Sequence, residues 1–253
     1  LYSEADGNVR KTWFLMISFF IAIIGLGWAF SYILNNQVIL YAAVAISVGM
    51  NVASYWYSDK LALMSSGAKP AEGPEWLELN RAVENLAITA GLPKPRVFII
   101  NDPAPNAFAT GRDPEHAVVA ATTGLLHMLN RTELEGVMAH ELSHVGNRDM
   151  LVMTVAVVLA GFVAMLADFL SRALFYGGGD DSKKSPIFLI VGIAGIILAP
   201  IAAQLIQLAI SRKREYLADA SGALLTRYPE GLASALEKIS AYGRPMQTAN
   251  HAT

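Results

Sequence analysis

Four stretches of this sequence contain no charged residue and are long enough to form membrane-spanning helices. A helix rises ~1.5 Å per residue, so about 20 residues cross the ~30 Å hydrocarbon core of a bilayer. Four such stretches in 253 residues exceed what a soluble core needs, and 54% of the residues are hydrophobic while only 16% are charged. We therefore expect membrane-spanning helices rather than buried helices of a soluble protein. The stretches are residues 12–34, 38–57, 150–167 and 187–210.

The four stretches differ in how clearly they predict a crossing. The first, second and fourth are long enough to span, whereas the third is short and runs into Asp168 and Arg172. The first is too long for the apolar core of a secretory signal, and the second follows it at once. Because the chain begins with Leu1 rather than methionine, we expect it to be a piece of a longer protein.

The basic residues predict the orientation in the membrane, because cytoplasmic loops carry an excess of lysine and arginine. Such residues precede the first stretch and follow the second and fourth, but none lies in the turn after the first. We therefore expect both termini and residues 59–149 to lie in the cytoplasm. The residues are Arg10, Lys11, Lys60, Arg212, Lys213 and Arg214.

Residues 59–149 have the pattern of a water-soluble α+β segment. Residues 75–90 have helical spacing and are followed by Gly91. Two short strands are expected at 96–100 and 117–121, and 106–111 is a candidate third strand. Thr132 and Glu135 predict a capping box at the start of the next helix.

Charge and cysteine content exclude several classes of function. The net charge of −2 gives no general attraction to nucleic acid, so no nucleic-acid partner is expected. The absence of cysteine excludes disulfides, thiolate metal ligands and cysteine nucleophiles.

The helix expected after the capping box contains the sequence His140-Glu141-Leu142-Ser143-His144. Residues at i and i+4 lie one above the other on a helix face, so His140 and His144 can bind one zinc ion. Glu141 points ~100° away, which suits a general base that takes a proton from water on the metal. The core-facing stripe is expected to be Leu134, Met138, Leu142 and Val145, which leaves the histidines free to face a cleft.

Zinc needs at least one further protein ligand, with one position left for water. Asp149 lies five residues after His144 and requires a sharp turn, which Gly146 would permit. Glu215 follows the fourth apolar stretch, and Asp219 lies four residues later on the same helix face. Spacing alone does not separate a ligand from an acidic pair on a solvated face. The candidates are Asp149, Glu215, Asp219, His116 and His127.

Three motifs together resemble the HtpX-type membrane metallopeptidases, which are related to the CAAX prenyl protease. The resemblance extends from about Asn8 to Arg244, nearly the whole chain. The motifs are Asn106-Ala107-Phe108-Ala109-Thr110-Gly111, His140-Glu141-Leu142-Ser143-His144 and Arg214-Glu215-Tyr216-Leu217-Ala218-Asp219.

The resemblance implies that Glu215 is the third zinc ligand and that Asp219 supports a ligating histidine. It also implies a cytoplasmic active site, a role in the quality control of misfolded membrane proteins as a stress response, and further chain beyond Thr253. The expected protein is a multi-pass protease of the inner or plasma membrane of a prokaryote. Its partners would be one zinc ion, the lipid bilayer and unfolded or misfolded membrane-protein substrates.

The expected fold is mainly α, with four transmembrane helices and a zincin-like α+β catalytic domain that carries a small β-sheet. Residues 1–58 hold two transmembrane helices, at about 12–34 and 38–57, and 59–149 form the catalytic domain. Residues 150–210 form a transmembrane or membrane-associated hairpin, with helices at about 150–170 and 187–210. Residues 211–253 continue the catalytic domain and supply the third ligand.

The expected mechanism is hydrolysis of a peptide bond by water activated by zinc, with Glu141 as general base. Candidates for stabilising the oxyanion are Tyr216, Arg214 and His116. An exposed edge strand, at 106–111 or 117–121, would bind an extended substrate through its backbone. The candidate substrate-binding residues are Asn106, Ala107, Phe108 and Ala109.

Three other functions compete with a cytoplasmic protease, and one of them, a transporter, is disfavoured because the apolar stretches have few buried charges. A zinc site inside the bilayer is disfavoured, because charged residues such as Arg131 and Arg148 flank the histidine motif closely. A catalytically inactive membrane scaffold or chaperone is the second alternative, and the intact Glu141 argues against it.

Overall fold

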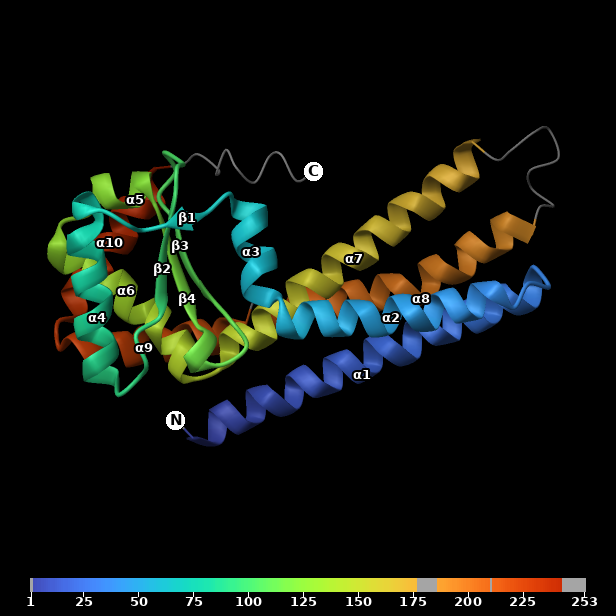
Figure 1. The fold of residues 1–253 in the computed structure, drawn as a ribbon, viewed down its shortest axis with the longest axis horizontal. Coiled ribbons are helices and arrows are strands. Elements are labelled where there is room, and N and C mark those ends of the chain that lie inside the picture. Colours follow the sequence, from blue (N-terminus) through green and yellow to red (C-terminus); the bar gives the residue numbers. More distant parts are fainter. Residues whose placement is uncertain (1, 177–185, 210, 243–253) are drawn as a thin grey trace. The chain divides into compact units, whose positions relative to one another are not determined.

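The structure is a computed structural model that describes residues 2–176, 186–209 and 211–242, and the chain forms two compact units (Figure 1). One unit comprises residues 1–9, 57–151 and 211–253, and the other comprises residues 10–56 and 152–210. Ile210, the last residue of the fourth expected span, and residues 243–253 lie outside the described residues.

The second unit is built from long apolar helices. Four windows are long and apolar enough to cross a membrane: Asp6–Ile33, Val38–Trp56, Asp149–Asp168 and Ala194–Thr226. The last window continues past α8 into α9. Because the first turn of α9 is charged, the part of this window that could cross a membrane lies in α8. The third apolar stretch thus belongs to a helix of sufficient length. The helices are α1 (Tyr2–Ile33), α2 (Val38–Trp56), α7 (Asp149–Tyr176) and α8 (Pro186–Ala209).

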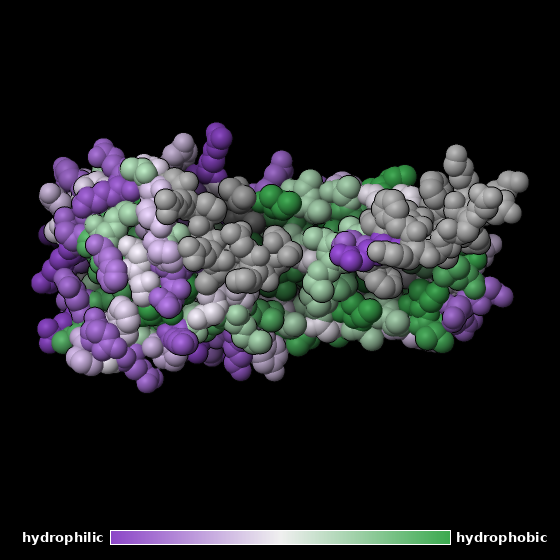
Figure 2. Space-filling model, turned by 90° about the horizontal axis from the view of Figure 1, so that it is seen from above, coloured by the Kyte–Doolittle hydropathy of each residue, from purple (hydrophilic) through white to green (hydrophobic). Residues whose placement is uncertain are grey.

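Large apolar side chains cover the outside of these helices. In α1, Phe14, Ile21 and Trp28 are all more than 60% exposed. Figure 2 shows a largely hydrophobic surface over this unit and a mainly hydrophilic surface over the unit with the sheet. A hydrophobic surface of this extent requires lipid rather than water around it.

The first unit contains a mixed four-stranded sheet in the order β1-β2-β4-β3. β4 pairs in parallel with β2 and antiparallel with β3, so β4 is central and β3 is an edge strand. The expected strand at 96–100 is confirmed, and 106–111 does contain a strand. The expectation that 117–121 is an edge is wrong, because β4 has partners on both sides. The strands are β1 (Lys69–Pro70), β2 (Arg96–Ile100), β3 (Ala107–Thr110) and β4 (Val118–Thr122).

Helix α6 is the centre of the first unit and contacts α4, α9, α10 and β3. Its predicted stripe of Leu134, Met138, Leu142 and Val145 is confirmed, since all four side chains are at most 5% exposed in the core. The helices are α3 (Ser58–Ser66), α4 (Leu77–Ala90), α5 (Thr123–Met128), α6 (Arg131–Gly146), α9 (Arg212–Thr226) and α10 (Pro229–Ala241), with short 3₁₀ turns η1 (Pro74–Trp76) and η2 (Pro114–His116). The mainly α-helical fold with four candidate membrane helices and a small sheet is as expected.

Two glycines allow other helices to approach α6 closely. A Cβ atom on Gly222 of α9 would lie 3.0 Å from the backbone nitrogen of His140. A Cβ atom on Gly136 of α6 would lie 2.7 Å from the backbone nitrogen of Leu232 in α10. α9 and α10 therefore pack directly against the backbone of the helix that carries the histidine motif.

Candidate metal centre

Helix α6 begins two residues earlier than the sequence predicted, with its N-cap at Asn130 rather than Thr132. The helix N-cap is Asn130, whose Oδ1 accepts a hydrogen bond from the Glu133 N–H at 3.0 Å, while Glu133 accepts one from the Asn130 N–H at 2.8 Å. The expected capping box of Thr132 and Glu135 is wrong. Thr132 donates to the Asn130 side chain instead, and Glu135 pairs with Arg131.

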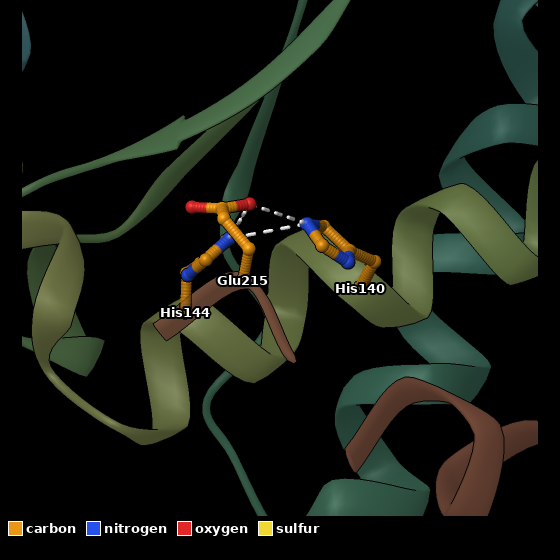
Figure 3. Close-up of side chains that lie close together, drawn as sticks. All are labelled: His140, His144 and Glu215. Atoms are coloured by element: carbon orange, nitrogen blue, oxygen red, sulfur yellow. Dashed lines mark hydrogen bonds and ion pairs between the residues drawn. The ribbon is translucent and has the colours of Figure 1, made fainter. Parts of the chain in front are cut away.

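His140 and His144 of α6 and Glu215 of α9 point toward one another (Figure 3). The two histidine Nε2 atoms are 3.2 Å apart, and Glu215 Oε2 lies 3.5 Å from one and 3.8 Å from the other. Tetrahedral zinc with bonds of ~2.0–2.1 Å places neighbouring ligand atoms about 3.3 Å apart. The spacing of these three atoms therefore fits a single metal ion of that size.

A carboxylate lies behind each histidine. Nδ1 of His140 is 2.8 Å from Asp219 Oδ1, and Nδ1 of His144 is 3.0 Å from Asp149 Oδ1. A proton held on Nδ1 by a carboxylate leaves the Nε2 lone pair free for a metal. Both imidazoles are thus oriented with their free lone pairs toward Glu215.

Asp149 therefore lies beside the cluster, on the far side of His144 from Glu215. From the sequence, Asp149 was a candidate third ligand, provided that the chain turned sharply at Gly146. Gly146 remains the last residue of α6, and the chain turns at Arg148, which has a φ of 54°. This turn directs the Asp149 carboxylate to Nδ1 of His144 rather than to the metal-facing nitrogens.

Glu141 lies outside the group of three, as its position on the helix requires. Its carboxylate accepts a hydrogen bond from the backbone N–H of Ala109 in β3. Burial raises the pKa of Glu141, although the nearby histidines act in the opposite direction. The site thus holds a carboxylate of raised proton affinity between the histidine helix and the edge strand.

The acidic surroundings also change the proton affinity of the histidines. Burial by itself lowers the pKa of His140, but the hydrogen bond with Glu215 and the charges of Glu141 and Asp219 outweigh it, so the pKa is raised. Burial likewise lowers the pKa of His144, and Asp149 reverses this effect. The four carboxylates around the two imidazoles make this group of residues favourable for a cation.

The remaining predicted site residues are more scattered. Arg214 is buried at 6% exposure, and Tyr216 is 70% exposed. His116 contacts Asp113 through Nδ1 and Arg112 through Nε2, so both ring nitrogens are engaged in the loop between β3 and β4. His127 lies in α5 and is exposed.

The loop before β3 is fixed to the end of β4. The backbone N–H of Asn106 donates to the Thr122 hydroxyl at 2.9 Å, and the Thr122 N–H donates to the Asn106 carbonyl at 2.9 Å. In an antiparallel pair these bonds alternate along the strand. Ala107 and Ala109 therefore direct their backbone groups away from β4, toward the free edge, while Phe108 faces β4 with its backbone.

The model of peptidase family M48 matches residues 75–252, which include all the residues of this site. The chain belongs to peptidase family M48. It is 46% identical to "Protease HtpX homolog" of Caldanaerobacter subterraneus subsp. tengcongensis, over all of this chain and 87% of that protein. It is 50% identical to the protein of the same name from Pyrococcus furiosus, over 91% of this chain and 79% of that one.

The fold also resembles that of a solved structure, the crystal structure of S. mikatae Ste24p. The TM-score is 0.53 at 20% identity, and the match covers 96% of this chain and 60% of that one, so this chain spans about three fifths of its length. The resemblance to HtpX-type proteins expected from the motifs is confirmed. Family membership and the four apolar helices show a membrane protease, and the group of His140, His144 and Glu215 indicates a metal ion.

Proposed function

We propose that this M48 protein is a zinc-dependent endopeptidase, with His140, His144 and Glu215 as metal ligands and Glu141 as general base. The observation that supports it most directly is the convergence of two Nε2 atoms and one carboxylate oxygen within 4.8 Å of one another. Nitrogen and oxygen donors at these separations suit zinc, and three protein ligands leave a position open.

The chemistry divides between the metal and the chain. Bound zinc supplies a Lewis acid that lowers the pKa of water and polarises the scissile carbonyl. Glu141 accepts the proton of the attacking water and later delivers it to the leaving nitrogen. Its raised pKa suits this exchange, because a proton is taken and released most readily near the working pH. Asp219 and Asp149 keep the two imidazoles in one tautomer.

The free edge of β3 supports binding of an extended substrate. Ala107 and Ala109 present backbone groups on that edge, and the Ala109 N–H already contacts Glu141. A substrate strand added there would lie beside the general base and be held through its backbone. Binding through the backbone depends little on the side chains of the substrate. It therefore suits unfolded or misfolded membrane proteins as substrates in quality control.

The basic residues around the apolar helices support an active site on the cytoplasmic side of a prokaryotic inner or plasma membrane. Labelling of single cysteines introduced at Ser65 and Asn36 tests this orientation, because the native chain contains no cysteine. We expect a membrane-impermeant reagent applied from outside intact cells to label position 36 and not position 65. The opposite pattern contradicts the orientation.

The zinc endopeptidase proposal is tested with the full chain in detergent, by metal analysis and cleavage of an unfolded protein. We expect one zinc ion per chain. Glu141→Gln should retain zinc and lose cleavage by at least about 1,000-fold, whereas Glu215→Ala should lose both. Zinc-free wild-type protein, or full cleavage by Glu141→Gln, contradicts the proposal. Stoichiometric zinc without cleavage supports the inactive scaffold or chaperone instead.

A further inference from the structure

The carboxylate of Asp149 is fully buried and only half satisfied. Its exposure is 0%, and Oδ1 lies 3.0 Å from Nδ1 of His144. Oδ2 is buried and has no hydrogen-bond partner among the described residues. A buried carboxylate with an unsatisfied oxygen is costly, and a nearby positive charge offsets that cost.

The backbone around Asp149 is fixed by a segment from the start of the chain. The carbonyl of Asn147, which is completely buried, accepts a hydrogen bond from the side-chain amide of Asn8 at 3.1 Å. Arg148 then takes its left-handed conformation, and its side chain is exposed. The junction between α6 and α7 thus presents Asp149 inward and Arg148 outward, so Arg148 does not supply the missing charge.

Arg214 is the buried cation of the described residues, with 6% exposure. It lies in the first turn of α9, directly before Glu215, and the two anions that act on its charge are Asp149 and Glu215. Its two basic neighbours, Arg212 and Lys213, are exposed. A guanidinium this deeply buried is poorly placed to meet a substrate carbonyl, which argues against the oxyanion role that the sequence suggested.

We propose that Arg214 is a positioning residue whose buried charge holds Asp149 against His144 and keeps Glu215 directed at the histidines. This inference rests on the proposed zinc function. It makes one cation support two of the three metal ligands, Glu215 directly and His144 through Asp149. When the first turn of α9 packs against α6, it places Glu215 beside the histidines. The same turn places the positive charge of Arg214 where it stabilises the Asp149 carboxylate behind His144. The metal site is therefore organised by a cation that touches neither the metal nor the substrate.

The test compares zinc affinity of the full chain in detergent, measured by competition with a chelator. Arg214→Gln removes the charge, Arg214→Lys retains it, and Arg212→Gln removes an exposed charge from the same turn as a control. We expect Arg214→Gln to weaken zinc binding about 10- to 100-fold, as for other groups that support metal ligands. Arg214→Lys should recover most of this loss, and Arg212→Gln should match wild type.

A double-mutant cycle with Asp149→Asn separates positioning from general destabilisation. If Arg214 acts in part through Asp149, the loss of zinc affinity in the double variant should be smaller than the product of the two single losses, and the loss that remains beyond Asp149→Asn alone measures its action on Glu215. The absorption spectrum of the cobalt-loaded protein should change in Arg214→Gln and not in Arg212→Gln, because it reports the arrangement of the ligands. Should Arg214→Gln fail to fold, the double variant should regain its fold, since it buries no uncompensated carboxylate at position 149.

Two results overturn the inference. One is an Arg214→Gln protein with the zinc affinity and cobalt spectrum of Arg212→Gln. The other is a double variant whose loss equals the product of the single losses, or that stays unfolded. A wild-type chain that binds no zinc contradicts the proposed function instead, before any variant is compared.

Discussion

The membrane helices and helix α6 are stabilised in different ways. In α1, α2 and α7, most glycines face open space, and Gly25, Gly49 and Gly161 have no described neighbour within 4 Å of an added Cβ. In α6, by contrast, the backbone of α10 lies against Gly136, and α9 approaches through Gly222. The membrane helices depend on a long run of apolar residues, whereas α6 is positioned by close contacts at particular residues. Substitutions should therefore be tolerated widely in the membrane helices and poorly around α6.

The largest expected effect is at Gly136. A valine there would place its Cβ 2.7 Å from the backbone nitrogen of Leu232, and backbone cannot move aside as a flexible side chain can. We expect Gly136→Val to destabilise the first unit by about 3 kcal/mol, measured by thermal unfolding in detergent. Gly161→Val in α7, where no described atom lies within 4 Å of an added Cβ, is the matched control. Equal melting temperatures for both variants would remove the distinction between the two kinds of helix.

The next effect concerns the buried ionic contact between α6 and α10. Glu133 accepts hydrogen bonds from Ser234 and Lys238 at 2.6 and 2.7 Å, and these contacts lower its pKa to about 2. We expect Glu133→Gln to cost about 2 kcal/mol at neutral pH. Glu135→Gln, which breaks only an exposed pair with Arg131, should change stability little.

The same contact predicts a pH dependence of stability. The pKa of Glu133 is lowered in the folded state, so its contribution is complete above the ordinary value of 4.5 and is lost as pH falls toward about 2. Melting temperatures of wild type and Glu133→Gln should therefore converge across that interval. A difference that stays constant from pH 7 to pH 3 contradicts this assignment.

At Gly222 we expect a smaller effect on stability but a specific effect on metal affinity. An alanine Cβ would lie 3.0 Å from the His140 nitrogen, so α9 must shift by a few tenths of an ångström. Glu215 and Asp219 lie on the same helix and would move with it. We expect Gly222→Ala to weaken zinc binding about tenfold, since ligand geometry sets affinity. Ala220→Ser, on the exposed face of α9, should leave zinc affinity unchanged.

The smallest effect is expected at the one close glycine contact within the described part of the membrane helices. A Cβ on Gly27 of α1 would lie 2.2 Å from the Cβ of Ala43 in α2, which is too close for two carbon atoms, so the two helices must move apart, and such movement costs less between helices in lipid than between helices of a packed core. We expect Gly27→Ala to cost about 1 kcal/mol in thermal stability. Gly25→Ala, which meets open space, should be neutral or slightly stabilising. A larger loss at Gly25 than at Gly27 is the result that this account does not allow.

The sequence predicted best what depends on local periodicity. The stripe of Leu134, Met138, Leu142 and Val145 follows from helical spacing, and all four are buried. The proximity of His140 and His144 likewise needs only the i, i+4 geometry of a helix. The proposed ligand Glu215 belongs to another segment, and spacing left it open until the resemblance to HtpX-type proteins was considered.

What the sequence could not supply depends on chain direction and on packing between distant segments. The turn before Asp149 occurs at Arg148, although a left-handed conformation is uncommon for arginine, so a sequence pattern pointed to Gly146 instead. The helix start at Asn130 was missed because Thr132 and Glu135 match the same capping pattern two residues later. The contact between Asn8 and Asn147 joins segments whose pairing no local pattern predicts.

The order of segments along the chain has a consequence for synthesis of the protein. The histidines precede the third and fourth apolar helices, whereas Glu215 and Arg214 follow them. The ribosome therefore synthesises His140 and His144 well before it synthesises Glu215, because α7 and α8 lie between them in the sequence. If Glu215 is the third ligand, as proposed above, the nascent chain cannot complete the metal site until its last apolar helix has been made, and peptidase activity would begin only when membrane integration is nearly finished.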